Sequence, residues 1–474
     1  MQYHSVLKAL LPYLLLSTSL MSALLQAQSL NSAVPVTYQR YCAQCHNEKI
    51  DGAPRPHNVG DWATRVEQKT DAQLLNSVKR GLGSMPAGGS CPNCSDQTLS
   101  AVIAWMKPRP GDIKQIADKP DLVKNLQRLN IPTGFQISVY ADDIEEPRGM
   151  ALGDDGIVYV GSRKAGKVYA VLPATEDHVE RQVKVIARGL HMPHGVVFSD
   201  GDLYVAEVSQ IIRFRGIDPL RGKSPAAEVV YGGMPKVNHH GWKTLHLGPD
   251  DKLYFPVGMP CNTCDYRSSQ PLFGSIVRMT KDGKDVEFIA KGIRHSVGFG
   301  FHPQTGVMWF SDNGQDFMGD NLPPDEINRL SQAGLDFGFP YFYGNNIPSP
   351  GYDRPPKGVT PPVFELPAHV APLGVHFYRG SMFPKSYRNK LLIAEHGSWN
   401  RTSKVGYRIS TLNIKNEKAS DYKPLINGWL QGESAWGRPV AFLELPDGSL
   451  LISDDKADVI YQLRYSPPRA DPSL

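Results

Sequence analysis

The fold is decided by the stretch Pro193-His194-Gly195-Val196-Val197-Phe198, which an Asp-Gly turn joins to a second run, Asp202-Leu203-Tyr204-Val205. β-Branched and aromatic residues on both sides of such a turn are typical of a β-hairpin. Five other stretches share this plan of a turn-like start, a strand, a Gly/Asp turn and a second strand; they start at Pro147, His240, Val297, Leu373 and Arg438. The chain therefore repeats one hairpin plan six times between residues 122 and 470.

Six units across residues 122–470 take about 58 residues each, which exceeds the roughly 40–45 residues of a minimal propeller blade. Insertions are therefore expected, chiefly between the fourth and fifth units. Radial repetition leaves few exposed sheet edges. We predict a mainly β protein whose larger domain, residues 122–470, is a six-bladed β-propeller.

Upstream of the repeats stands Cys42-Ala43-Gln44-Cys45-His46. Two cysteines separated by two residues and followed by a histidine are the attachment signature of a c-type haem. The thiols of Cys42 and Cys45 form thioethers to the porphyrin, and His46 becomes the proximal iron ligand. Met85 is the expected sixth ligand, and its thioether raises the reduction potential. The alternatives are a structural CxxC pair and a core methionine.

Ser95 is expected to cap a helix that ends at Met106. Residues 30–107 resemble the short bacterial class I cytochromes c, including those with a disulfide just after the methionine, here Cys91/Cys94. The resemblance implies a small all-α cytochrome c domain that holds haem c. Residues 108–121, which follow it, are predicted as a short polar linker.

Residues 1–27 are typical of a cleaved secretory signal, with cleavage expected after Ala27. An uncleaved anchor is the alternative, and no later segment is long and apolar enough to span a bilayer. All six cysteines fall in CxxC pairs. In an exported protein Cys91/Cys94 and Cys261/Cys264 suit local disulfides. A periplasmic location is therefore predicted.

The chain has 474 residues, 21% of them charged, and a net charge of only +4 without a Lys/Arg run. This excludes a nucleic-acid footprint and a polybasic membrane patch. Partners should be small molecules or other proteins. No GxGxxG motif opens a helix, so no NAD site is predicted.

Cationic and titratable residues stand at the strand entrances of the repeats. The innermost strands of a propeller deliver their ends to a central channel, so these residues are expected at one rim. They are Arg148, His194, His240, Arg294, His295 and Arg438. Such a rim suits a polyanionic ligand in the channel mouth. The alternative is a set of solvated turn residues.

Several longer motifs follow one another along the repeats. They are His239-His240-Gly241-Trp242, Val257-Gly258-Met259-Pro260-Cys261-Asn262, Ser311-Asp312-Asn313-Gly314, Pro324-Asp325-Glu326-Ile327-Asn328 and Glu395-His396-Gly397-Ser398-Trp399-Asn400-Arg401. With these motifs residues 122–470 resemble the soluble PQQ-dependent sugar and sorbosone dehydrogenases, six-bladed propellers that oxidise aldoses or related aldehydes.

The resemblance implies that His240 is the general base, which takes a proton from a sugar C1 hydroxyl or an aldehyde hydrate. Help of this kind is worth about 10²–10⁴-fold in rate. It also implies a set of side chains that hold the cofactor's carboxylates and quinone oxygens. Together with the rim, the candidates are Arg148, His194, Asn262, Arg294, Arg401, Lys404 and Arg408. Cys261 stands where the aldose enzymes have an arginine, which favours the sorbosone branch.

The acidic loop from Asp316 to Glu326 resembles the calcium region of the same family. Calcium prefers oxygen ligands and would polarise the quinone as a Lewis acid. The implied ligands are Asp320, Asn321, Asp325 and Glu326, and the alternative is a solvated acidic loop. The Cys261/Cys264 pair is expected to clamp the loop that presents Asn262.

These parts together predict a quinohaemoprotein dehydrogenase. A sugar or aldehyde substrate reduces PQQ by two electrons, and the haem removes them one at a time for a soluble cytochrome or a terminal oxidase. Two other interpretations stay open. One is a calcium-dependent propeller lactonase or other hydrolase, and the other is a non-catalytic propeller that binds a protein or glycan and displays a cytochrome.

Overall fold

The computed structural model describes residues 34–467 apart from 35, 39, 48–52, 57–58, 84, 109–119, 175–180, 223–224, 267 and 353–355. The predicted signal peptide and most of the predicted linker lie outside the described residues. The chain divides into two compact units, residues 1–118 with 468–474 and residues 119–467. Each helix of the described part is too short or too polar to cross a membrane.

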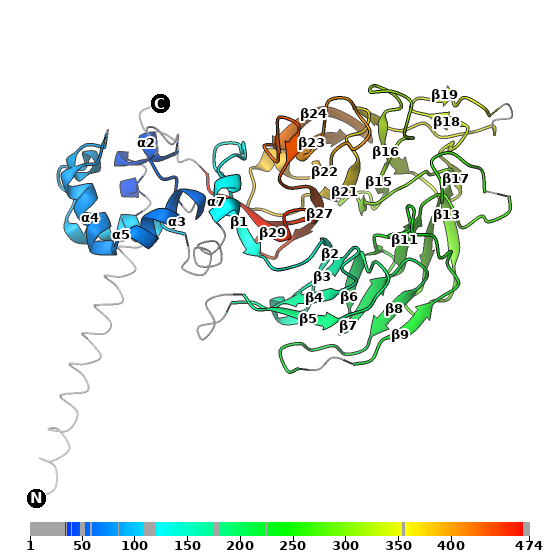
Figure 1. The fold of residues 1–474 in the computed structure, drawn as a ribbon, viewed down its shortest axis with the longest axis horizontal. Helices are drawn as coiled ribbons and strands as arrows, with labels where there is room; N and C mark the ends of the chain where they lie inside the picture. The colour runs from blue at the N-terminus through cyan, green and yellow to red at the C-terminus, as the bar shows by residue number, and fades with distance from the viewer. Residues whose placement is uncertain are drawn as a thin grey trace, which may run out of the picture. The chain divides into compact units, whose positions relative to one another are not determined.

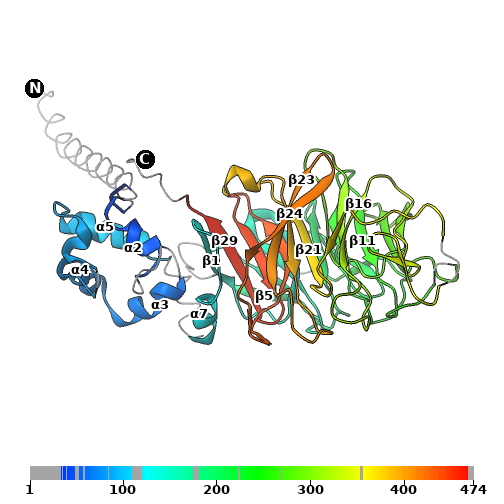
Figure 2. The ribbon, with the colours of Figure 1, turned by 90° about the horizontal axis from the view of Figure 1, so that it is seen from above.

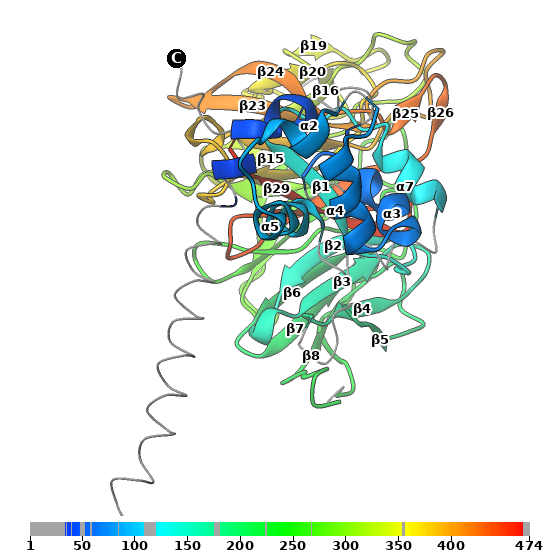
Figure 3. The ribbon, with the colours of Figure 1, turned by 90° about the vertical axis from the view of Figure 1, so that its left-hand side faces the viewer.

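The first unit is helical, as predicted (Figure 3). Its elements are α2 (Ala43–Asn47), α3 (Val59–Gln68), α4 (Asp71–Arg80), the 3₁₀ turn η2 (Ala87–Ser90) and α5 (Asp96–Met106). Thr70 and Gln73 form a reciprocal capping box at the start of α4. Ser95 accepts a hydrogen bond from the amide of Thr98, which confirms the predicted cap of α5. The helices bury Trp62 and a group of aliphatic side chains between them.

The second unit is a six-bladed propeller, and Figure 1 shows its sheets arranged in a ring. Five blades are β2–β5 (Pro147–Leu152, Val158–Ser162, Val168–Val171, Val183–Ala187), β6–β9 (Gly195–Ser199, Asp202–Ala206, Ile211–Phe214, Glu228–Tyr231), β10–β13 (His246–Leu247, Leu253–Val257, Ser275–Met279, Glu287–Lys291), β14–β16 with β20 (Phe299–Phe301, Met308–Asp312, Asp325–Leu330, Phe364–Leu366) and β21–β24 (Pro372–Phe377, Leu391–Glu395, Arg408–Lys415, Lys418–Ile426). The predicted fold is confirmed.

The sixth blade joins the two ends of the propeller sequence. Its strands β27 (Pro439–Glu444), β28 (Leu450–Asp454) and β29 (Val459–Tyr465) are completed by β1 (Phe135–Ala141), which comes from the start of the unit. β1 lies beside β29 in both Figure 1 and Figure 2, and Phe135 pairs with Tyr465 in an antiparallel ladder. Hydrogen bonds between the first and last strands therefore close the ring, a closure that the repeats alone did not predict.

The largest insertion lies in the sequence between the fourth and fifth predicted units, as expected, and in the fold it falls between β16 and β20, within the fourth blade. It holds β17 (Leu335–Asp336), which pairs in parallel with β13 of the preceding blade, and the hairpin β18–β19 (Phe342–Tyr343, Ile347–Pro348). Smaller additions are α7 (Pro120–Leu126), η3 (Asp154–Gly156), η4 (Lys385–Tyr387) and the hairpin β25–β26 (Leu430–Gln431, Ser434–Ala435). The predicted start of the third unit, at His240, was wrong. Its inner strand starts at His246, and His240 lies in the loop before this strand.

Tight contact between neighbouring inner strands explains why glycine follows the rim residues. A Cβ atom on Gly195, next to His194, would lie 2.4 Å from the amide nitrogen of Leu245 in the next blade. A Cβ atom on Gly149, next to Arg148, would lie 2.7 Å from the carbonyl oxygen of His194. Glycine lets the inner strands converge, and the residues just before these positions are brought to the channel end.

Candidate functional site

The cytochrome unit contains a cavity of about 450 Å³ that is lined by Cys42, Cys45, His46 and Met85. Both thiols are free of a disulfide. The Nδ1 atom of His46 lies 2.7 Å from the carbonyl oxygen of Pro54, so Nδ1 carries the proton and Nε2 is the nitrogen available to a metal. Burial lowers the pKa of His46, which keeps the imidazole neutral. These residues fit the attachment and ligation of a haem c.

The two predicted local disulfides are formed. Cys91 is bonded to Cys94, directly after η2 and the Met85 turn. Cys261 is bonded to Cys264 in the connection between β11 and β12. Within the described residues the only cysteines left unpaired are thus the two of the haem signature.

The propeller has a central cavity of about 430 Å³ at the ends of its inner strands. Four arginines line it, namely Arg148, Arg163, Arg294 and Arg438, together with His239, His240, His295, His369 and His396. Carboxylates are fewer, since the lining contains only Asp316 and Asp325. Five of the six predicted rim residues therefore gather at one cavity, His194 being the exception, and the wall of that cavity is cationic.

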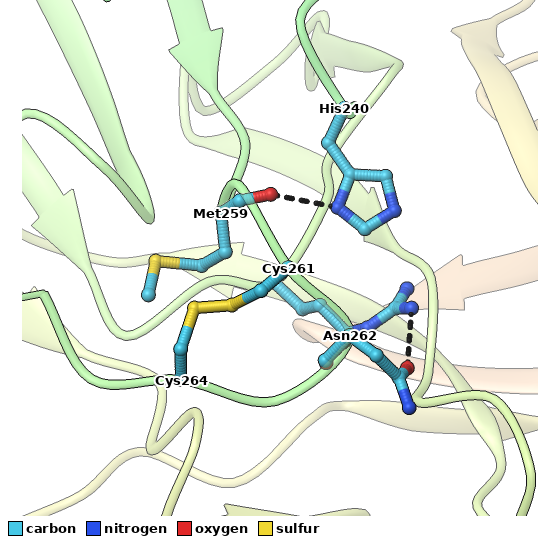
Figure 4. Close-up of a disulfide and its surroundings, with 6 residues drawn as sticks. His240, Met259, Cys261, Asn262 and Cys264 are labelled. Atoms are coloured by element: carbon cyan, nitrogen blue, oxygen red, sulfur yellow. Dashed lines mark hydrogen bonds between the residues drawn. A yellow bond between two sulfur atoms is a disulfide. The ribbon is translucent and has the colours of Figure 1, made fainter. Parts of the chain in front are cut away.

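His240 is placed as a neutral acceptor in this wall. Its Nδ1 atom lies 2.9 Å from the carbonyl oxygen of Met259 (Figure 4), so Nδ1 is the donor and Nε2 keeps its lone pair. Burial, helped by the charge of Arg294 and by His239, lowers the pKa of His240 to about 2. The ring stacks on His295 with centroids 4.2 Å apart and an angle of 15° between the planes.

The wall behind His240 contains polar atoms without partners in the described protein. They are Nε and Nη1 of Arg148, Nδ1 of His194, Nε1 of Trp242, and both ring nitrogens of His295. His194 is 2% exposed and does not line the cavity, and burial followed by the charges of Arg148 and Arg163 keeps its pKa well below the ordinary value. Such unpaired groups are costly in a folded protein, which points to a polar ligand.

One ion pair anchors the first of these arginines. Arg148 donates to Asp455, and His396 lies 2.7 Å from the other oxygen of the same carboxylate. The neighbouring charges of Arg148 and His396 hold the pKa of Asp455 well below its usual range despite burial. Arg148 is therefore fixed through one nitrogen, while its buried Nη1 and Nε atoms have no partner in the described protein.

Asn262 acts as a brace and does not line the cavity. Its side-chain oxygen, where a dashed line ends in Figure 4, accepts from Nη2 of Arg294 at 2.9 Å and from the amide of Asp316 at 2.8 Å. Its side-chain nitrogen donates to the carbonyl oxygen of Asp316 at 3.0 Å. The polar atoms of Asn262 are therefore engaged within the protein, and their effect is to hold Arg294 against the wall.

Three predicted cofactor ligands lie elsewhere. Arg401 donates to the carbonyl oxygen of Asp320, Lys404 donates to that of Glu433, and neither residue lines the cavity. Arg408 forms an ion pair with the fully buried Glu395, with Nε 2.7 Å from the carboxylate. The reason is register, because Arg408 faces Glu395 across the β22–β23 ladder. The structure supports no direct cofactor contact for these three residues.

The predicted calcium ligands are not gathered either. Asp325 and Glu326 are successive residues of β16, so their side chains point to opposite faces. Asp325 accepts from the amides of Gly314 and Ala371, and Glu326 from that of Gly344. Asp320 accepts from the amide of Thr402, while Asn321 lies near Arg401. Within the described residues no cluster of three or more His, Cys, Asp and Glu side chains has metal-binding geometry.

Some lining residues were missed by the predicted site. Arg163, His369, His396 and Trp399 line the cavity without having been singled out as ligands. A signal existed for two of them, since His396 and Trp399 belong to the motif that starts at Glu395. Arg163 and His369 do not occupy a position that recurs in the sequence repeats. They reach the cavity wall only because the propeller closes into a ring.

A profile for a domain of unknown function, DUF7133, matches residues 122–471, and the profile of cbb3-type cytochrome c oxidase subunit III matches residues 32–106. A Borreliella burgdorferi protein named only as uncharacterized is 40% identical over 354 residues, which are 71% of this chain and 91% of its own. Cytochrome c5 of Azotobacter vinelandii is 38% identical over 69 residues, 14% of this chain and 82% of its own.

Among solved structures, the holo form of the pyranose dehydrogenase PQQ domain from Coprinopsis cinerea is similar to the propeller. It superposes with a TM-score of 0.59 at 18% identity and covers 71% of this chain and 97% of its own. Identity at this level shows a shared propeller fold. The match to the cytochrome profile shows that the first unit is a cytochrome c domain. The match over residues 122–471 shows that the chain belongs to the family defined by the domain of unknown function DUF7133.

Proposed function

We propose that the chain is a periplasmic quinohaemoprotein oxidoreductase that oxidises a sugar or a related aldehyde, with PQQ in the propeller cavity and haem c in the cytochrome domain. One observation carries the proposal. Donor atoms of Arg148, His295 and Trp242 are buried at the cavity wall without partners in the described protein. Each such group costs about 1–3 kcal/mol when it stays unpaired, so the wall is built for a polar ligand.

The cavity residues fit PQQ by charge. PQQ is a polycarboxylate with quinone oxygens, and four arginines line the cavity against two aspartates. Guanidinium groups bind carboxylates through paired, charge-assisted hydrogen bonds. Arg294 is already oriented by Asn262 and Asp316, with Nη2 2.8 Å from the Asp316 carboxylate. We infer that Arg148, Arg163, Arg294 and Arg438 hold the cofactor.

His240 is the proton acceptor in this proposal. Its Nδ1–H group is fixed to the Met259 carbonyl oxygen, so Nε2 is the atom that accepts the proton of a C1 hydroxyl or an aldehyde hydrate. Stacking against His295 prevents rotation of the ring. PQQ, when bound, supplies an acceptor for the hydride and its two electrons.

The cytochrome domain gives these electrons a route out of the protein. Haem c carries one electron at a time, and a soluble cytochrome or a terminal oxidase is the proposed acceptor. We further propose residues 1–27 as the secretory signal, 30–107 as the cytochrome domain, 108–121 as the linker and 122–470 as the propeller. Calcium stays a prediction, because the four side chains expected to bind it do not form one site.

An anaerobic absorbance titration tests the function. Holo-protein is loaded with calcium and PQQ, and L-sorbosone, glucose and simple aldehydes are added in turn while the haem spectrum is recorded. We expect substrate to reduce the haem only when PQQ is present. A His240→Gln protein loaded in the same way is the matched control, and its haem should stay oxidised. If PQQ neither binds nor changes the haem response, the proposal fails and lactone hydrolysis is the activity to test next.

A further inference from the structure

Two exposed aromatic side chains stand at the mouth of the propeller cavity. Phe317 is 72% exposed and Trp399 is 67% exposed, and their ring centroids lie 5.7 Å apart at an angle of 87°. Phe317 belongs to the 313–324 loop of the fourth blade, next to the cavity residue Asp316. Trp399 belongs to the 396–407 loop of the fifth blade and lines the cavity itself. We call Phe317 and Trp399 the aromatic pair.

The backbone of Phe317 indicates that its position is enforced. Its φ angle is +69°, in the left-handed region that a bulky side chain rarely adopts. Such a conformation costs free energy and persists only where the surrounding structure over-determines it. The conformation does not bury the phenyl ring. It presents the ring to solvent beside Trp399. The strained backbone therefore exposes the ring and does not help to bury it.

The 313–324 loop is anchored on both sides of Phe317. Before it, Asp316 is held by Asn262 and by Nη2 of Arg294 at 2.8 Å. After it, Nε2 of His369 lies 2.8 Å from the carbonyl oxygen of Gly319. These contacts come from three different parts of the propeller, and they restrict the movement of the loop.

The two loops are also tied directly to each other. The Asp320 carboxylate accepts from the amide of Thr402 at 2.9 Å, and Arg401 donates to the carbonyl oxygen of Asp320. Ser398, just before Trp399, is held by Val405 through two hydrogen bonds. Its amide donates to the carbonyl oxygen of Val405 at 2.9 Å, and its hydroxyl oxygen accepts from the amide of Val405 at 3.0 Å. Arg401 and Asp320 therefore serve as a cross-blade tie, and the aromatic pair is a preorganised surface.

The chemistry of the pair differs from that of the cavity wall. The wall offers cations and imidazoles, whereas the pair offers two perpendicular apolar faces without a formal charge. The C–H faces of a pyranose ring are weakly positive and apolar, and they stack on the negative face of an aromatic ring, while the hydroxyls remain in water. A perpendicular pair forms a corner that can contact one face and one edge of such a ring.

We propose that the aromatic pair is a carbohydrate-binding subsite, which stacks a pyranose ring at the cavity mouth and selects glycosides and oligosaccharides over small aldehydes. The choice of substrate class rests on the proposed function, because the reacting end of the sugar must enter the cavity with His240. The binding itself does not rest on it. Phe317 and Trp399 are specificity-determining residues in this proposal, and His240 remains the only group assigned to the chemistry.

Sugar binding without turnover is the first test. The full-length haem-loaded protein without PQQ is titrated calorimetrically with maltose and cellobiose, and separately with glyceraldehyde. Trp399→Ala and Phe317→Ala are each expected to weaken disaccharide binding about tenfold, in line with the loss of one stacked ring. Phe288→Ala is the matched control, since Phe288 is 49% exposed on the outer strand β13 and should leave binding unchanged.

Turnover of the PQQ-loaded protein is the second test. We expect both variants to raise KM for the disaccharides. Phe317 does not line the cavity, so Phe317→Ala should leave kcat, and kcat/KM for glyceraldehyde, at the values of the unmodified protein. Trp399→Phe should recover most of the loss, because it keeps an aromatic face. Unchanged disaccharide affinity in both alanine variants overturns the subsite. So does slower haem reduction at unchanged disaccharide KM, since that result assigns the pair to protein docking.

The two tests separate this inference from the proposed function. If PQQ fails to bind but disaccharide binding depends on the aromatic pair, the subsite stands and the oxidoreductase proposal falls. If PQQ-dependent haem reduction occurs with no effect of either substitution on disaccharide affinity, the oxidoreductase proposal stands and the subsite falls.

Discussion

The Nδ1 atom of His240 lies 2.9 Å from the carbonyl oxygen of Met259. A carbonyl oxygen can only accept, so this contact fixes the tautomer of the imidazole and leaves Nε2 as the basic nitrogen. His240 also has a left-handed backbone, with φ of +53°. The loop before β10 therefore sets both the orientation and the protonation pattern of the residue on which the proposed chemistry depends.

Replacement of this imidazole tests its role directly. His240→Gln keeps a polar side chain but has no nitrogen lone pair, so we expect kcat to fall by about 10²–10⁴-fold, the usual value of a general base. PQQ binding should persist, because the arginines of the wall are untouched. His191→Gln is a suitable control, since His191 contacts Asn238 and does not line the cavity. Equal loss in the control, or none in His240→Gln, contradicts the assignment.

The pH dependence of kcat/KM follows from the lowered pKa of His240. The neutral imidazole is the active form, so activity is lost only as the pH falls through the pKa of the folded protein, which burial lowers to about 2. An anionic cofactor beside Arg294 raises this pKa, although burial still opposes the charged form. We expect the acid limb of the holoenzyme well below the ordinary histidine value of about 6.5. A limb at or above that value would show that another group carries the proton.

Much of the fold could be predicted because each blade repeats local information. The rim could be predicted for the same reason, since Arg148 and His194 both precede a glycine that lets the inner strands converge. The ring closure could not, because the pairing of Phe135 with Tyr465 joins residues that no repeat relates. Local sequence patterns predict where the strands lie, whereas the partner of each strand is determined by long-range pairing.

The site was predicted less completely for a related reason. Arg408 faces Glu395 across a ladder, and this register is invisible in the sequence until both strands are placed. Arg401 meets Asp320 only because the fourth and fifth blades are neighbours. The separation of Asp325 from Glu326 was the more avoidable error, since adjacent residues of one strand always face opposite sides.

Gly258 is expected to be essential for the imidazole stack. A Cβ atom at this position would lie 2.7 Å from Nδ1 of His295 and 2.8 Å from Cβ of His240. Gly258→Ala must therefore displace both rings, and we expect a loss of about 1–3 kcal/mol in the free energy of unfolding together with a fall in kcat. Gly300→Ala is the control, because its nearest neighbour would be 3.5 Å away. Thermal unfolding and steady-state kinetics of both variants check this, and equal behaviour would contradict it.

The Cys261–Cys264 disulfide is expected to act on PQQ affinity through Arg294. It closes the loop that holds Asn262 (Figure 4), and Asn262 in turn orients Arg294 and Asp316. Replacing both cysteines by serine frees this loop, so we expect about tenfold weaker PQQ binding, or about 1.4 kcal/mol, with an unchanged haem spectrum. PQQ titration followed by absorbance measures both quantities in one sample.

The double replacement Cys91→Ser with Cys94→Ser is the matched control, because that disulfide belongs to the cytochrome domain and has no contact with Asn262 among those described. It should leave PQQ affinity unchanged. A different outcome would be equally informative. If the Cys261/Cys264 variant binds PQQ normally but its haem is no longer reduced by substrate, the disulfide takes part in electron transfer, and its structural role in bracing Arg294 is secondary.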